Sequence, residues 1–176
     1  MNRKGSFESY LTLISNIRSA FDNTKYQAPA IRTTFLVGFP SETEEDFEKT
    51  KEFLKELKCL WSGVFTYSKE EDTPSFLMKN QIKERVKKKR MAILQEEQSK
   101  ITSELLKAFV GKEMLVLIEE LIENEKGIAI GRAWFQAPDV DGAVVVNFKE
   151  EDESIKGNGI QEGELVRVKI IKVLGF

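Results

Sequence analysis

The feature that most constrains the fold of this 176-residue sequence is an alternation of helical and strand-like segments that supplies only two strands in residues 1–80. Such alternation is typical of parallel β/α architecture, in which right-handed crossovers join neighbouring strands. Parallel sheets are normally covered on both faces and contain more than two strands. We therefore expect residues 1–80 to be part of a larger barrel or sheet.

Local patterns define this alternation. The first segment carries apolar residues at helical spacing: Tyr10, Ile14, Ile17 and Phe21. Ile31–Val37 is rich in β-branched and aromatic residues and predicts a strand. Ser41 or Thr43 then caps a predicted helix with one apolar face, and Val64–Tyr67 predicts the second strand.

A connecting helical segment is expected over residues 81–110, because neither glycine nor proline occurs between Met78 and Phe109. Apolar residues fit a stripe on one long helix or on two: Ile82, Val86, Ile93, Ile101, Leu105 and Phe109. The run Lys83–Arg90 is basic. It is interpreted either as a solvated helix face or as a contact to nucleic acid.

Residues 111–176 have a different texture, with short strand-like runs separated by turn residues: Glu113–Leu121, Gly127–Ala133, Gly142–Phe148 and Glu164–Leu174. These runs predict a small antiparallel barrel of the oligonucleotide-binding type, a shape that accepts RNA, single-stranded DNA or protein ligands. The segment contains eight Lys and Arg against thirteen Asp and Glu, so its charge of about −5 opposes phosphate binding. The acidity fits a basic protein partner or serves solubility alone.

Composition excludes several kinds of chemistry. The chain has no histidine and a single cysteine, Cys59, which excludes an internal disulfide, histidine base catalysis and a cysteine-rich metal site within the chain. We expect Cys59 to be a buried small hydrophobe. No apolar run approaches the length of a membrane helix, and the basic start has no apolar segment behind it. We expect a cytoplasmic protein without a membrane partner.

The segment Arg32–Phe47 contains Gly38-Phe39-Pro40-Ser41-Glu42-Thr43, which lies where a strand passes into its helix. It is similar to the Val-Gly-Phe-Pro-Gly-Glu-Thr stretch of radical-SAM enzymes, where the fifth barrel strand borders the S-adenosylmethionine site. Ser41 replaces the family's usual glycine.

Strand parity places the polar and slim side chains of this strand on one face, away from Phe35 and Val37. The start of the chain, Met1–Ser6, resembles the end of the preceding barrel strand in methylthiotransferases, where the methionine is internal. The resemblance therefore implies four cofactor-binding residues: Arg3, Thr34, Leu36 and Gly38.

Two further segments resemble the methylthiotransferase family of radical-SAM enzymes. Val64–Pro74 is similar to the sixth barrel strand and its loop, and Glu70-Glu71 matches the branch that modifies an aspartate of small-subunit ribosomal protein twelve. The tRNA-modifying branch usually has Arg-Pro-Gly there. Gly131–Gly142 is similar to the Ala-Pro-Glu-Val-Asp-Gly segment of the TRAM domain in the protein-modifying branch. The residues expected to contact the substrate are Tyr67, Glu70, Glu71, Arg132, Asp139 and Asp141.

The resemblance implies an α/β fold: the closing units of a radical-SAM β/α barrel over residues 1–80, a connecting helix over 81–110 and a TRAM barrel over 111–176. The family adds a methylthio group to an unactivated carbon with S-adenosylmethionine, two 4Fe-4S clusters and a sulfur donor. None of the six cysteines that hold these clusters is present. We expect no catalytic or metal-binding residue in this chain, no bound cofactor and no activity alone. A tRNA-modifying enzyme and a non-enzymatic TRAM module are the alternatives.

Overall fold

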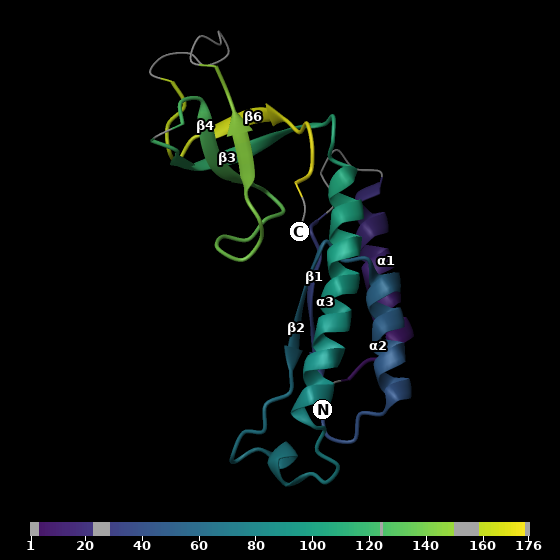
Figure 1. Cartoon of the computed structure of the whole chain (residues 1–176). Helices are drawn as coiled ribbons and strands as arrows, with labels where there is room; N and C mark the ends of the chain where they lie inside the picture. Colours follow the sequence, from purple (N-terminus) through teal and green to yellow (C-terminus); the bar gives the residue numbers. More distant parts are fainter. Residues whose placement is uncertain (1–3, 23–28, 124, 150–158, 175–176) are drawn as a thin grey trace. The chain divides into compact units, whose positions relative to one another are not determined.

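The structure is a computed structural model that describes residues 4–22, 29–123, 125–149 and 159–174 (Figure 1). It divides into two compact units, one from Met1 to Leu105 and the other from Leu106 to Gly175. Each unit is described by itself. None of the helices in the described ranges is long and apolar enough to cross a membrane.

The first unit has the predicted alternation of helix and strand. Its elements are α1 (Phe7–Asp22), β1 (Arg32–Val37), α2 (Glu44–Leu57), β2 (Trp61–Thr66), a 3-10 turn (Pro74–Leu77) and α3 (Glu84–Lys107). The two strands pair in parallel, with Arg32 opposite Trp61 and Val37 opposite Thr66. The predictions of two parallel strands are therefore confirmed, although β2 begins three residues before the predicted Val64.

Helix α2 has well-defined ends. Thr43, one of the two predicted capping residues, is the N-cap: its hydroxyl accepts the Asp46 N–H, and the Asp46 carboxylate accepts the Thr43 N–H. The Thr43 hydroxyl also donates to this carboxylate at 2.7 Å, and the donations from the Thr43 backbone and hydroxyl, led by the backbone one, lower the pKa of the Asp46 carboxyl. At the other end, Lys58 has a left-handed φ of 44°, and Arg18 donates to the carbonyl oxygens of Leu57 and Lys58.

The helices cover one face of the β1–β2 pair (Figure 1). The core of this unit consists of buried residues from both strands, from α2 and α3 and from the segment between α2 and β2: Phe35, Val37, Phe47, Leu54, Leu57, Cys59, Val64 and Leu94. On the opposite face of the strands Thr34 is exposed and Phe65 is 61% exposed. The predicted division of β1 into a packing face and an open face is confirmed.

Helix α3 is a single helix and packs into the first unit through a partly polar face. Its buried residues are Lys87, Arg90, Leu94, Gln98 and Thr102. The predicted apolar stripe does not coincide with the buried face of α3, because Val86 is exposed and Ile93 and Ile101 are only half-buried. The polar residues on the buried face bind backbone carbonyls: Lys87 donates to the Tyr67 oxygen and Thr102 to the Leu60 oxygen. These bonds reach both ends of β2.

We expect Thr102→Val to lower the free energy of unfolding of the first unit by about 1–3 kcal/mol, because the change leaves the buried Leu60 carbonyl without its 2.7 Å hydroxyl donor. The control is Thr50→Val, which removes a hydroxyl bonded only to a carbonyl of its own helix and is expected to change stability by less than about 0.5 kcal/mol. Urea unfolding followed by Trp61 fluorescence measures both. Equal effects of the two substitutions would contradict the importance of the α3 contact.

The second unit is a curled four-stranded antiparallel sheet of β3 (Glu113–Leu121), β4 (Ile128–Ala133), β5 (Val144–Asn147) and β6 (Leu165–Lys169), in the order β5-β4-β3-β6. Every strand falls within a predicted run. Alternate side chains point into the interior, which includes Met114, Val116, Ile118, Ala129, Ala133 and Val146. A bulge between Ile118 and Glu120 shifts the register of β3 against β4.

Candidate functional site

The loop from Gly38 to Thr43 follows β1 at the carboxyl end of the parallel pair, the end at which β/α proteins bind their ligands. Its backbone turns at two residues with left-handed φ angles, Gly38 at 78° and Ser41 at 70°. The Ser41 N–H donates to the carbonyl of Asn80 at 3.0 Å, which ties the loop to the segment before α3. Ser41 therefore adopts a left-handed conformation that favours glycine.

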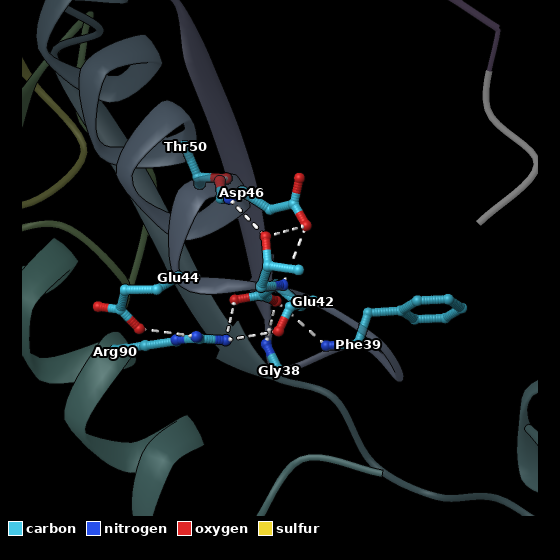
Figure 2. Close-up of polar contacts among 8 residues, drawn as sticks. Gly38, Phe39, Glu42, Glu44, Asp46, Thr50 and Arg90 are labelled. Carbon is cyan, nitrogen blue, oxygen red and sulfur yellow. Dashed lines mark hydrogen bonds and ion pairs between the residues drawn. The ribbon is translucent and has the colours of Figure 1, made fainter. Parts of the chain in front are cut away.

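Glu42 holds this loop from within (Figure 2). Its Oε2 accepts the backbone N–H groups of Gly38, at 2.5 Å, and Phe39, at 3.2 Å, and its Oε1 accepts the Arg90 Nη1 at 2.7 Å. Both side chains are nearly buried, with 6% of Arg90 and 12% of Glu42 exposed. Arg90 Nη2 also pairs with Glu44 at 2.9 Å. The carboxylate thus links two loop amides to helix α3.

Lys87 lies one helical turn before Arg90 and reaches the loop after β2. Its Nζ donates to the Tyr67 carbonyl oxygen at 2.7 Å, while the Tyr67 N–H donates to the Val37 carbonyl at 2.8 Å. The Lys87 stem crosses Gly38 so closely that a Cβ at Gly38 would lie 2.4 Å from Lys87 Cγ. Glycine is therefore required at position 38 both for its φ and for the passage of Lys87.

The predicted cofactor residues lie in different surroundings. Thr34 is exposed on the open face of β1, with its hydroxyl beside Gly63 of β2, and Leu36 is half-buried on the same face. Gly38 is buried, and both its amide and the space beside its Cα are already occupied by Glu42 and Lys87. Arg3 lies outside the described residues.

The predicted substrate residues of the first unit separate into two kinds. Tyr67 is only 7% exposed, with its ring edge-on to Phe39 and facing the Lys87 ammonium, and its contact with a substrate stays a prediction. Glu70 and Glu71 are exposed, and Glu70 accepts a hydrogen bond from the Ser68 hydroxyl. Packing of the loop against α3 explains the burial of Tyr67.

In the second unit, Arg132 pairs with Glu119 across β4 and β3 at 3.2 Å. Asp141 closes its own loop, because its Oδ2 accepts the Ala137 N–H at 2.7 Å. Asp139, with a left-handed φ of 58°, is exposed at the tip of this loop beside Val140. Of the two predicted acidic contacts, Asp139 is therefore displayed, whereas Asp141 has a structural role.

Sequence reasoning missed Glu42, Lys87 and Arg90. The basic run Lys83–Arg90 was interpreted as a solvated face or an RNA contact, yet two of its cations are buried. A signal was available in the spacing, because Lys87 and Arg90 share a helix face with Leu94. Composition alone could not distinguish this face from the exposed one.

Cys59 is buried, as predicted, and burial raises the pKa of its thiol to about 11. Compared with the ordinary value of 9.0, this pKa lowers the thiolate fraction at pH 8 by about 100-fold. We expect Cys59 to react with a disulfide reagent at least about 100-fold more slowly in the native chain than in urea. Comparable rates in the two states would contradict the burial and the raised pKa.

Comparison with known proteins shows the family to which the chain belongs. Residues 110–176 match the TRAM domain family. The chain is 53% identical, over all its length, to the ribosomal protein uS12 methylthiotransferase RimO of Treponema denticola, of which it covers 38%. It is 40% identical over 97% of its length to the RimO of Lachnoclostridium phytofermentans, of which it covers 36%, and 39% identical over 93% of its length to that of Aquifex aeolicus, of which it covers 35%. The chain thus belongs to the RimO family of methylthiotransferases and corresponds to the carboxyl-terminal part of its members.

Proposed function

We propose that this chain forms part of a radical-SAM enzyme that adds a methylthio group to an aspartate β-carbon of ribosomal protein uS12. The observation that carries the proposal is 53% identity across the whole chain to a uS12 methylthiotransferase. The chain spans less than two-fifths of the length of such relatives. Residues 1–80 are proposed to be closing units of the barrel, residues 81–110 the connecting helix and residues 111–176 the substrate-recruiting TRAM domain.

The open face of β1 and β2 fits one side of an S-adenosylmethionine pocket. The exposed Thr34 offers a polar contact through its hydroxyl, and the half-buried Leu36 offers an apolar one. Gly38 would act through the loop that it turns, and Arg3 would add a polar contact at the mouth. S-adenosylmethionine would supply the radical and the methyl group, and these residues would bind and orient it.

The 4Fe-4S clusters do not fit this chain. Cluster ligands are thiolates, whereas Cys59 is buried in an apolar core with a pKa raised to about 11. We therefore propose that the cluster ligands and the sulfur-delivery chemistry belong to the remainder of the family protein. The chain alone is expected to be inactive, and its predicted cytoplasmic location stays a prediction.

Substrate recruitment is assigned to acidic and polar residues on both units. Glu70 and Glu71 after β2, together with Asp139 at the tip of the second-unit loop, are exposed and carry charge that complements a basic protein. Arg132 would contribute while paired with Glu119, and Asp141 would act by holding the loop that displays Asp139. Tyr67 would support the Gly38–Thr43 loop by packing against Phe39.

Binding of the whole chain to purified uS12 and to a tRNA anticodon stem-loop, at about 150 mM salt where weak charge contacts are screened, tests the proposal. We expect the chain to bind uS12 and not the stem-loop. We expect Asp139→Lys to weaken the binding of uS12 at least about fivefold, because charge reversal at an interface edge repels a basic partner. Glu104→Lys, an exposed charge reversal on α3, is the matched control. Preference for the stem-loop would support the tRNA-modifying alternative. Against that alternative, the burial of Lys87 and Arg90 leaves the exposed surface of the Lys83–Arg90 run less basic than the sequence indicates.

A further inference from the structure

Two buried cations on one turn of α3 contact the two loops at the carboxyl ends of β1 and β2. Taken over the whole residue, Lys87 is 7% and Arg90 is 5% exposed. Lys87 donates to the backbone carbonyl of Tyr67 in the loop after β2. Arg90 binds the Glu42 carboxylate, which in turn accepts the Gly38 and Phe39 amides of the loop after β1. These hydrogen bonds therefore fix the two loops.

Burial of two cations is costly for stability, and an apolar pair of similar volume is often equally stable or better. Buried charged groups that form hydrogen bonds favour a single arrangement of the segments they join, because hydrogen bonds have preferred directions. Here the Arg90 guanidinium also lies over the Phe47 ring, with 5.3 Å from its carbon to the ring centroid, and pairs with Glu44. Arg90 is thus held by three groups, the Phe47 ring, Glu44 and Glu42.

We propose that Lys87 and Arg90 are positioning residues that hold the loops after β1 and β2 in the arrangement that receives S-adenosylmethionine; the proposal rests on the proposed function. Arg90 acts through Glu42, which fixes the Gly38–Phe39 amides. Lys87 acts directly on the Tyr67 carbonyl, and its stem fills the space beside Gly38. Helix α3 thereby sets the separation of the two loops, although neither cation touches the cofactor.

The first test measures amide hydrogen exchange in this chain, which reports local opening of the loops. We expect Arg90→Met to speed exchange at Gly38 and Phe39 at least about tenfold and Lys87→Met to speed exchange at Tyr67 by a similar factor, with smaller changes at the core residue Leu54. Lys88→Met and Lys89→Met remove exposed charges from the same helix and serve as controls. Uniform acceleration that includes Leu54, or equal effects of the controls, would overturn the proposal.

The second test uses the full-length protein with its clusters loaded. We expect Lys87→Met and Arg90→Met to raise the KM for S-adenosylmethionine at least about fivefold with cluster content unchanged, and Arg90→Lys to recover part of the loss because it keeps one charged bond to Glu42. A fall in kcat with unchanged KM would overturn the positioning role. If the unmodified protein fails to bind S-adenosylmethionine, the proposed function itself fails, whereas the exchange results still decide whether the cations fix the loops.

Discussion

Phe47→Ala is expected to lower the free energy of unfolding of the first unit by about 3–5 kcal/mol, the range for removal of a fully buried aromatic ring. Phe47 is 1% exposed and packs in the core with Leu54, Val37 and Leu94. Its ring also lies beneath the Arg90 guanidinium. The substitution therefore creates a cavity and removes the support of Arg90 at once.

Each unit contains one of the two tryptophans of the chain, Trp61 in the first and Trp134 in the second. Urea unfolding in a Trp134→Phe background thus reports the first unit alone. Phe65→Ala is the matched control, because Phe65 is 61% exposed on the open face of β2, and we expect a change below about 0.5 kcal/mol. In the full-length protein Phe65→Ala should become costly if that face lines a closed barrel. Equal losses for both substitutions in this chain would contradict the one-sided core.

Gly131→Ala is expected to lower the stability of the second unit by at least about 3 kcal/mol, at the upper end of the cost of overpacking. A Cβ at position 131 would lie 2.3 Å from the backbone oxygen of Leu117 and 2.8 Å from Val116 Cγ1. The obstructing oxygen belongs to the paired strand β3, so it cannot move as a flexible side chain would. The β3–β4 ladder must separate to accept the methyl group.

Urea unfolding followed by Trp134 fluorescence in a Trp61→Phe background measures this effect. Gly163→Ala is the control, because Gly163 has a left-handed φ of 84° with open space where its Cβ would lie. We expect Gly163→Ala to lower the free energy of unfolding by about 1–2 kcal/mol, through backbone strain alone. A smaller loss for Gly131→Ala than for Gly163→Ala would show that β3 and β4 do not approach as closely as described.

Local sequence patterns predicted the elements well, because burial and hydrogen bonding act there at short range. The alternation of Thr34 and Leu36 with Phe35 and Val37 predicted both faces of β1, and turn residues marked every strand of the second unit. Thr43 was one of two candidate caps, and only the structure decided between it and Ser41. The closing of the first unit into a larger barrel stays a prediction.

The candidate site was less predictable because its contacts join residues distant in sequence. Arg90 pairs with Glu42 across 48 positions, and Lys87 with the Tyr67 carbonyl across 20. A charged run normally predicts a solvated face, so two buried cations contradict the usual pattern. Tyr67 and Asp141 have the residue types of contact residues, yet one is packed in the structure and the other caps its loop.

The most direct test of the account is mass spectrometry of uS12 and of tRNA after each is incubated with the full-length, cluster-loaded protein, S-adenosylmethionine and a sulfur donor. The account predicts that one methylthio group is added to an aspartate of uS12 and that tRNA is unchanged. A methylthio group on a tRNA adenosine, with uS12 unmodified, would contradict it.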